Sequence, residues 1–114
     1  MNIAFSGCRH FTDYEFLESK LNEILRNNNF KILVGDAKGI DSLIIRYAKE
    51  YNFEYTVFKA DWDQHGKSAG PIRNREMINI ADGLIAFWNN ESRGTKNAIE
   101  EANKKGIKIK IVKI

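Results

Sequence analysis

Apolar and polar positions along the chain alternate between short strand-like runs and longer stretches with helical spacing. Five apolar runs have the length of strands, and they cover residues 3–5, 32–34, 55–58, 84–88 and 107–111. The fourth run is continuously apolar, which is typical of a strand covered on both faces. The fifth run alternates with lysines, which is typical of an edge strand.

The stretches between the first three runs have the spacing of amphipathic helices. Thr12 opens the first of these helices, and Glu15 three residues later predicts a capping box. Asparagines 27–29 end this helix. The second helix begins at Ile40 and keeps its apolar spacing to Tyr51.

A long polar loop over residues 60–70 precedes the third helix, in which Pro71 suits a first-turn position. The last helix covers residues 95–105, where Ala98 and Ala102 predict close packing. The predicted order is strand, helix, strand, helix, strand, loop, helix, strand, helix, strand. Such alternation predicts an α/β fold of three layers, in which a mostly parallel five-stranded sheet has helices on both faces.

Length and composition agree with a single domain over residues 1–114, because domains span roughly 50–250 residues. The 43% of hydrophobic residues and 29% of charged residues exclude a disordered chain. No apolar run approaches the roughly 18 residues of a membrane span, and no signal peptide is visible. The single cysteine, Cys8, excludes an internal disulfide framework and a multi-cysteine zinc site. We therefore expect a cytoplasmic protein.

The net charge is mildly positive at +3, from 18 basic and 15 acidic residues. Lysines and arginines are scattered, apart from a small cluster at residues 104–113 that we expect to be solvated. A dedicated nucleic-acid binder shows a concentrated basic stripe more often. The charge pattern therefore argues against nucleic acid as the partner.

Unusual residues gather in the loops that follow the predicted strands. These loops hold six of the eight glycines, both histidines and several arginines and lysines, whereas the helix-to-strand connections are plain. In parallel sheets, ligands bind at the carboxyl ends of the strands, near a switch in strand order. We therefore predict the functional site at this edge of the sheet.

The first two of these loops have features of anion cradles. Gly7 lets the backbone approach a ligand, and Arg9 can hold a phosphate, although a plain turn with a solvated arginine has the same pattern. Gly35 and Gly39 surround the start of the second helix, where backbone N–H groups bind anions. Asp41 either caps that helix or binds a ribose hydroxyl.

The polar loop over residues 60–70 mixes carboxylates with a histidine. Asp61, Asp63 and His65 have donor atoms for a metal, but three candidates on one loop are weak grounds, and we predict neither metal nor cofactor. Trp62 either stacks on a nucleotide base or packs in the core.

Basic and hydroxyl side chains begin the last two helices. Arg73 opposes the helix dipole, so it either binds a phosphate or carboxylate or pairs with Glu76. Ser92, Gly94 and Thr95 predict a second anion site, unless the serine or threonine serves only as the N-cap. Two cradles and two arginines on one edge predict a phosphorylated or nucleotide-like ligand.

Five motifs occur together along the chain: SGCR at 6–9, GDAKGID at 35–41, ADW at 60–62, GKSAGPIRN at 66–74 with Met77, and FW at 87–88 with SRGT at 92–95. With these motifs the chain resembles the YspA/YpsA-related branch of the SLOG superfamily, the Rossmann-like group of LOG and DprA proteins. The resemblance covers nearly the whole chain and is most specific at residues 66–74. It implies a Rossmann-like domain that binds nucleotides or relatives of ADP-ribose. It also implies a homodimer or higher oligomer.

The resemblance leaves enzymatic activity undecided. LOG phosphoribohydrolases cleave the N-glycosidic bond of a nucleoside monophosphate and carry the motif Pro-Gly-Gly-x-Gly-Thr-x-x-Glu. Gly94 and Thr95 match this motif, whereas Asn90 occupies the proline place and Ala98 the place of the catalytic glutamate. Because cleavage needs a carboxylate to stabilise positive charge or to activate water, another carboxylate would have to substitute, and the candidates are Asp41, Asp61 and Glu76.

We therefore expect a protein that binds a nucleotide or an ADP-ribose- or NAD-related ligand at the carboxyl edge of the sheet, as a sensor, carrier or sequestering protein. The alternatives are an N-glycosidase or phosphoribohydrolase and, as in the DprA branch, a single-strand DNA-binding module. We expect no membrane association. The predicted ligand-binding residues are Ser6, Gly7, Arg9, Gly35, Asp36, Ala37, Lys38, Gly39, Asp41, Asp61, Trp62, Lys67, Arg73, Asn74, Trp88, Ser92, Gly94 and Thr95.

Overall fold

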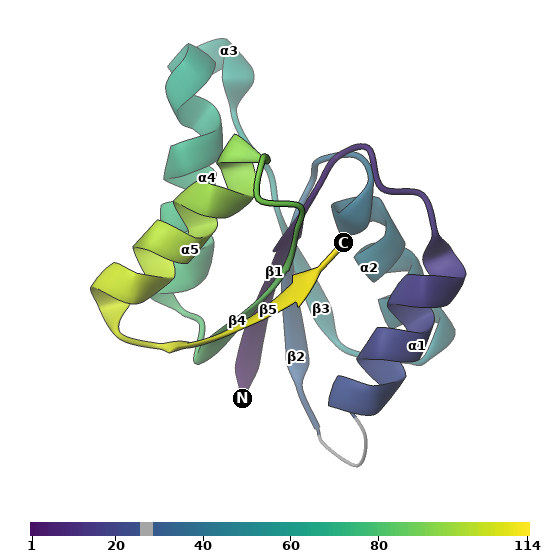
Figure 1. The fold of residues 1–114 in the computed structure, drawn as a ribbon. Coiled ribbons are helices and arrows are strands. Elements are labelled where there is room, and N and C mark those ends of the chain that lie inside the picture. Colours follow the sequence, from purple (N-terminus) through teal and green to yellow (C-terminus); the bar gives the residue numbers. More distant parts are fainter. Residues whose placement is uncertain (26–28) are drawn as a thin grey trace.

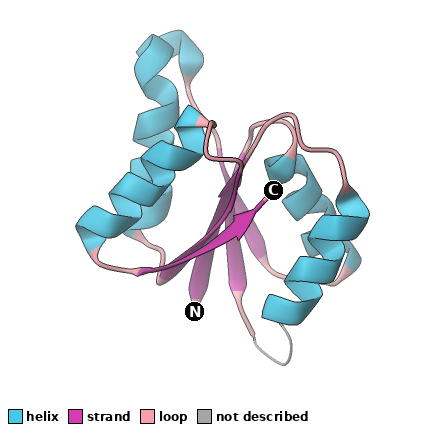
Figure 2. Ribbon diagram, viewed as in Figure 1, coloured by secondary structure: helices cyan, strands magenta, loops and turns pink. Residues whose placement is uncertain are grey.

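A computed structural model describes residues 1–25 and 29–114 as a parallel β-sheet between two layers of helices (Figures 1 and 2). The strands are β1 (Asn2–Gly7), β2 (Lys31–Gly35), β3 (Tyr55–Phe58), β4 (Gly83–Trp88) and β5 (Lys108–Lys113). The helices are α1 (Tyr14–Ile24), α2 (Ile40–Glu50), α3 (Trp62–His65), the 3-10 turn η1 (Gly66–Ser68), α4 (Ala69–Asn79) and α5 (Arg93–Lys105). None of the described helices is long and apolar enough to cross a membrane.

The strand order is β3-β2-β1-β4-β5, and every pair of neighbouring strands is parallel. This confirms the predicted α/β fold, with β5 at an edge as its alternating pattern indicated. β1 lies at the centre, with β2 on one side and β4 on the other. The order therefore reverses at β1, and the carboxyl ends of β1 and β4 form the switch point where such sheets bind ligands.

Alternating side chains of the central strands fill two separate cores. Ile3 and Phe5 of β1 pack into the layer of α1 and α2, whereas Ala4 packs into the layer of α4 and α5. Helices α4 and α5 lie side by side (Figure 1). Ala98 and Ala102 of α5 are fully buried in the core that α5 forms with α4 and the sheet. The predicted close packing at these two alanines is confirmed.

The start of α1 differs from the predicted capping box. Asp13 is the N-cap, because its carboxylate accepts a hydrogen bond of 3.1 Å from the Phe16 backbone N–H. The helix therefore begins one residue later than predicted, and Thr12 stands before the cap. Of the asparagines expected to end this helix, Asn27 and Asn28 lie outside the described residues.

The predicted loop over residues 60–70 contains two short helical segments, α3 and η1, and α4 begins at Ala69 rather than at Pro71. A proline two residues inside a helix is tolerated, because N–H groups of the first turn have no intrahelical partner. Asp61 caps α3 by accepting from the Gln64 N–H at 3.1 Å. Segments of three or four exposed residues have no hydrophobic periodicity, so the sequence pattern could not predict them.

The lysine cluster at residues 104–113 is exposed as expected, except that Lys105 has a structural role. Its Nζ donates to the backbone carbonyls of Ile78, Asn79 and Ala81 at 3.0, 2.6 and 2.9 Å. A helix leaves its last carbonyls without intrahelical partners. Lys105 therefore closes the C-terminal end of α4 from the neighbouring helix.

Candidate functional site

A cavity of about 1050 Å³ opens at the carboxyl edge of the sheet, as large as the bigger small-molecule sites, which span roughly 300–1,000 Å³. Loops after β1, β2 and β4 and the starts of α4 and α5 form its walls. Most predicted ligand-binding residues line it, namely Ser6, Gly7, Arg9, Gly35, Asp36, Ala37, Lys38, Asp41, Trp62, Lys67, Arg73, Asn74, Ser92, Gly94 and Thr95. The topology thus gathers these dispersed positions into one site.

Three predicted residues lie outside this cavity, and each has a local structural role. Gly39 is the N-cap of α2 at a φ of 72°, where a Cβ would overlap the backbone of the β1–α1 loop. Asp61 caps α3. Trp88 donates its indole N–H to the Ser92 carbonyl at 3.2 Å and so braces the β4–α5 loop.

The cavity also has lining residues that were not predicted to bind the ligand. Five of them lie within the quoted motifs, and they are Cys8, Gly70, Pro71, Met77 and Arg93. Phe5, His10, Asn89 and Glu91 adjoin those motifs, so extending each motif by one residue would have found them. Asn97 lies one turn into α5, and no signal in the sequence distinguishes it from an exposed helix residue.

Close backbone contacts hold the β1–α1 loop against the start of α2. The Ile40 N–H donates to the Cys8 carbonyl at 3.1 Å. A Cβ on Gly7 would overlap the Ile40 side chain. Gly7 is therefore required for the packing of these two elements, whether or not a ligand also approaches it.

Polar side chains fix the corner between β4 and α5. Asn89 Oδ1 accepts from the N–H groups of Glu91 and Ser92 at 2.9 and 3.0 Å. Ser92 is the N-cap of α5, with its hydroxyl 3.4 Å from the Thr95 nitrogen. Gly94 has open space where a Cβ would stand. The start of this 13-residue helix thus borders the cavity, and its free N–H groups and dipole favour an anion there.

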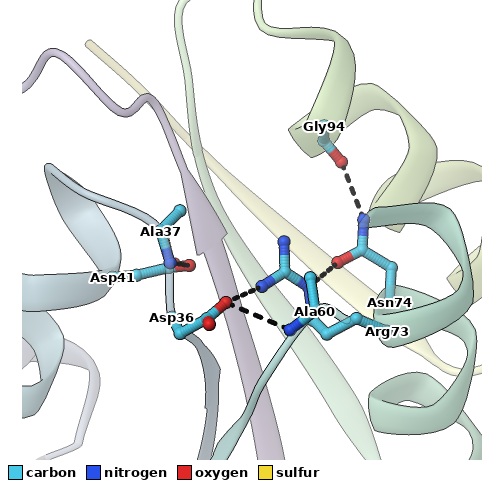
Figure 3. Close-up of polar contacts among 7 residues, drawn as sticks. All are labelled: Asp36, Ala37, Asp41, Ala60, Arg73, Asn74 and Gly94. Carbon is cyan, nitrogen blue, oxygen red and sulfur yellow. Dashed lines mark hydrogen bonds and ion pairs between the residues drawn. The ribbon is translucent and has the colours of Figure 1, made fainter. Parts of the chain in front are cut away.

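A network around Arg73 joins the end of β2, the helix α4 and the start of α5 (Figure 3). Arg73 donates from Nη1 to Asp36 Oδ1 at 2.9 Å and from Nε to Asn74 Oδ1 at 2.9 Å. The buried Asn74 then donates to the Gly94 carbonyl at 3.2 Å and to Asn97 at 3.0 Å. Because Arg73 pairs with Asp36, the alternative pairing with Glu76, an exposed residue outside the cavity, is wrong.

Asp41 is a buried carboxylate beside this network. Its Oδ2 accepts from the Ala37 N–H at 3.2 Å, so it braces the β2–α2 loop, and it makes no side-chain cap of α2. Burial raises the pKa of Asp41 to about 6, although the nearby Arg73 and the Ala37 N–H both oppose this rise. A Cβ on Gly35 would overlap the Arg73 guanidinium and lie 2.8 Å from Asp41 Oδ2. Glycine at this position therefore lets the two charged groups approach each other.

Trp62 of α3 lines the cavity, with 57% of its surface exposed. Its ring edge packs beside Gly70 of α4, where a Cβ would lie 3.5 Å away. The core-packing alternative for Trp62 is therefore wrong, and stacking on a ligand stays a prediction.

The place of the LOG glutamate, Ala98, is fully buried in the core and does not line the cavity. The carboxylates that do line it are Asp36, Asp41 and Glu91. Asp61 and Glu76, two of the three carboxylates expected to substitute, do not. Within residues 1–25 and 29–114, no group of three histidine, cysteine or acidic side chains is arranged to hold a metal.

Comparison with known proteins identifies relatives of the chain. Residues 1–65 match the family model YAcAr, described as the YspA, cpYpsA-related SLOG family. The chain is also similar to the Gene 61 protein of Mycobacterium phage D29. The two are 32% identical over 115 residues, which span 94% of this chain and 92% of the phage protein.

Two solved structures share the fold. DNA processing protein A (DprA) from Streptococcus pneumoniae superimposes with a TM-score of 0.80 at 18% identity, over 96% of this chain and 49% of that protein. This chain thus spans about half the length of DprA. The structural genomics target TM1055 superimposes with a TM-score of 0.72 at 14% identity, over 95% of this chain and 71% of that one. At identities this low, the likeness to these two structures establishes the Rossmann-like fold and nothing beyond it.

Proposed function

Because the chain belongs to the YspA, cpYpsA-related SLOG family, we propose that it binds a nucleotide or a nucleotide-derived ligand, such as ADP-ribose or NAD, in the cavity at the carboxyl edge of the sheet. The protein would act as a sensor, carrier or sequestering protein. The observation that carries this proposal is the convergence of two glycine-rich loops and a capped helix start on one cavity at the switch point.

The start of α5 is the expected place for the ligand's phosphate. Ser92, Gly94 and Thr95 line the cavity there, and Arg93 adds a guanidinium at the first position of the helix. An arginine at a helix start is unfavourable unless an anion offsets it. A phosphate would accept from the free N–H groups of this turn and neutralise Arg93.

Trp62 is the expected place for the base. An exposed tryptophan that lines a cavity is a flat apolar surface on which an aromatic ring can stack, and such stacking contributes about 1–3 kcal/mol per base. Trp62 and the start of α5 both line the cavity, so a ligand with separate base and phosphate groups would have a place for each.

Hydrolysis of an N-glycosidic bond is the second candidate, and one observation favours it. Asp41 lines the cavity, is buried, and has a pKa raised to about 6 by desolvation. A carboxyl group that titrates near neutral pH is suited to general acid–base catalysis. Asp41 is therefore the carboxylate on which this alternative depends.

One experiment separates the two candidates. The thermal stability of the protein is measured with AMP, ADP-ribose, NAD and cyclic nucleotides, and each mixture is then separated by chromatography. A ligand at about 100 times its dissociation constant adds roughly 2.7 kcal/mol of stability. Stabilisation with the compound intact supports binding, whereas release of a free base that Asp41→Asn abolishes supports hydrolysis.

If no nucleotide stabilises the protein or is cleaved, the proposal fails. The remaining alternative is binding of single-stranded DNA, which we consider because the chain shares the fold of DNA processing protein A. A steep dependence of binding on salt would be its signature. A homodimer or higher oligomer and a cytoplasmic location remain expectations, and light scattering on the purified protein tests the first.

A further inference from the structure

The carboxyl end of β2 carries two carboxylates against one guanidinium. Asp36 follows the strand directly, Asp41 lies in the first turn of α2, and both line the cavity. Arg73 faces them across Gly35 (Figure 3). Lys38 on the same loop also lines the cavity, and with it the charges of this wall balance. The start of α5 differs, because its helix dipole and Arg93 are both positive. The cavity thus has one part suited to a phosphate and another suited to hydroxyl groups.

Asp36 has one oxygen engaged and one available. Its Oδ1 accepts from Arg73 Nη1 at 2.9 Å and from the Ala60 N–H at 3.3 Å. Within the part of the chain that the structure describes, no group donates to its Oδ2, and 34% of the side chain is exposed. The two bonds to Oδ1 hold the carboxylate in place, so Oδ2 is a preorganised acceptor for a hydroxyl group.

The position of Asp36 in the sheet indicates which hydroxyl group it would accept. The order β3-β2-β1-β4-β5 matches five strands of the dinucleotide-binding fold. In that fold an acidic residue farther along the chain binds the ribose 2′-hydroxyl. The phosphate of the ligand is expected at the start of α5 in this chain, on the same cavity. Asp36 stands at the tip of the strand beside β1, with its carboxylate in the cavity.

We propose that Asp36 binds the 2′-hydroxyl of the ligand's ribose, so that the protein selects ligands with an unmodified ribose and rejects those with a 2′-phosphate. This inference rests on the proposed function, because it assigns one group of the nucleotide. A 2′-phosphate would meet the charges of Asp36 and Asp41, and the guanidinium that could neutralise it is already paired. Lys38 and Lys67 also line the cavity, but both are exposed and screened by solvent.

Titration of the unmodified protein tests the inference. AMP, ADP-ribose and NAD are each titrated beside the same compound with a 2′-phosphate on its adenosine ribose, and AMP also beside 2′-deoxy-AMP. The 2′-phosphorylated compounds should bind at least about tenfold more weakly. The deoxy compound should also lose about tenfold or more, because a hydrogen bond to a charged group is lost.

Asp36→Asn tests the assigned residue. It removes the negative charge and releases Arg73 to meet a 2′-phosphate, so the discrimination against the phosphorylated compounds should fall about tenfold or reverse. Asp63→Asn is the control, because it removes an exposed carboxylate from α3 that does not line the cavity. This variant should keep the discrimination of the unmodified protein. Thermal unfolding of both variants shows whether each one folds.

The possible results separate the inference from the function on which it rests. If none of the compounds binds, the proposed function fails and the inference fails with it. If the 2′-phosphorylated compounds bind as tightly as the others or more tightly, the inference alone is overturned. Discrimination that persists in a folded Asp36→Asn protein overturns the role of Asp36. If that variant does not fold, the titrations of the unmodified protein still show whether the protein distinguishes a 2′-hydroxyl from a 2′-phosphate or a 2′-deoxy ribose.

Discussion

Arg73 and Asp36 form an ion pair, with 2.9 Å between Nη1 and Oδ1, that connects the first half of α4 to the end of β2. The Arg73 side chain is only 11% exposed, so solvent screens the pair less than it screens a surface pair. Because α4 begins at Ala69, Arg73 stands in the second turn, beyond the first turn in which the helix dipole disfavours a cation. Asp36 supplies the negative charge that compensates the Arg73 guanidinium.

Replacing Arg73 tests whether this residue supports both the fold and the site. Arg73→Ala removes its bonds to Asp36 and Asn74, and we expect a loss of about 1–3 kcal/mol in the free energy of unfolding in urea. Arg75→Ala is the matched control on the same helix, because Arg75 is 67% exposed with a 3.7 Å pair to Glu101. It should cost less than about 0.5 kcal/mol. Equal losses in the two variants would contradict the structural role of Arg73.

Affinity gives a second measurement on the same variants. At a temperature where both variants are folded, Arg73→Ala should bind ADP-ribose much more weakly. The reason is that Arg73 lines the cavity and holds Asp36 in place beside it. Arg75 lies outside the cavity, so Arg75→Ala should bind as the unmodified protein does. Unchanged affinity in Arg73→Ala would remove this residue from the site.

The buried Asp41 predicts an unusual dependence of stability on pH. Its pKa is about 6 in the folded chain and near 3.8 when solvated, so the folded state binds the proton more tightly. Stability therefore falls as the pH rises from about 4 to about 6, and the charged form costs the fold on the order of 3 kcal/mol at neutral pH.

Asp41→Asn should relieve this cost, raising the free energy of unfolding at pH 7.5 by about 1–3 kcal/mol. The difference from the unmodified protein should shrink towards pH 4, where Asp41 is protonated in the folded chain and about half protonated in the unfolded chain. Urea unfolding at several pH values measures it. A variant that is less stable at pH 7.5 would show that Arg73 and the Ala37 N–H hold the charged form more strongly than burial opposes it.

Lys105 should contribute to stability well beyond an ordinary surface lysine. Lys105→Met removes the donor to three carbonyls at the end of α4, and we expect a loss of about 1–3 kcal/mol in thermal or urea unfolding. Lys104→Met is its neighbour and control, because Lys104 is 75% exposed and makes only a 3.7 Å pair with Glu101 among the described residues. That control should change stability by less than about 0.5 kcal/mol. A small effect in both would show that water replaces the Lys105 bonds.

The two tryptophans should behave differently. Trp62→Ala should leave the free energy of unfolding within about 0.5 kcal/mol, because the side chain is mostly exposed. Its affinity for ADP-ribose should fall about tenfold or more, through loss of stacking. Trp88→Phe should instead cost about 0.5–1.5 kcal/mol of stability, through loss of its bond to Ser92, and retain the affinity. Full affinity in Trp62→Ala would exclude stacking on this residue.

The order of the elements and the edge that carries the site were predictable because both depend on local patterns. Apolar runs and helical spacing each repeat over a few residues, and the rule for parallel sheets places every strand-to-helix loop on the same edge. Ser92 as an N-cap and Ala98 as a core position also follow from local spacing.

The partners of individual side chains were not predictable, because they depend on contacts between distant segments. The Arg73–Asp36 pair joins residues 37 positions apart, and Lys105 reaches carbonyls at least 24 positions away. Glu76, three residues farther along the same helix, is the natural partner in sequence, but the Arg73 guanidinium instead meets Asp36 at the end of β2. Asp61 and Trp88 were placed in the site for the same reason, since nothing local shows which way a residue in a loop or at the end of a strand faces.

Amide chemical shifts of the labelled protein, followed during titration with ADP-ribose, test the central claim most directly. We predict that the largest changes fall on Gly94 and Thr95 at the start of α5 and on Asp36 and Ala37 at the end of β2. Changes gathered instead at the smaller hollow of about 470 Å³ between α1 and β5 would contradict the proposed site. The absence of any change at millimolar ADP-ribose would contradict the binding of this ligand.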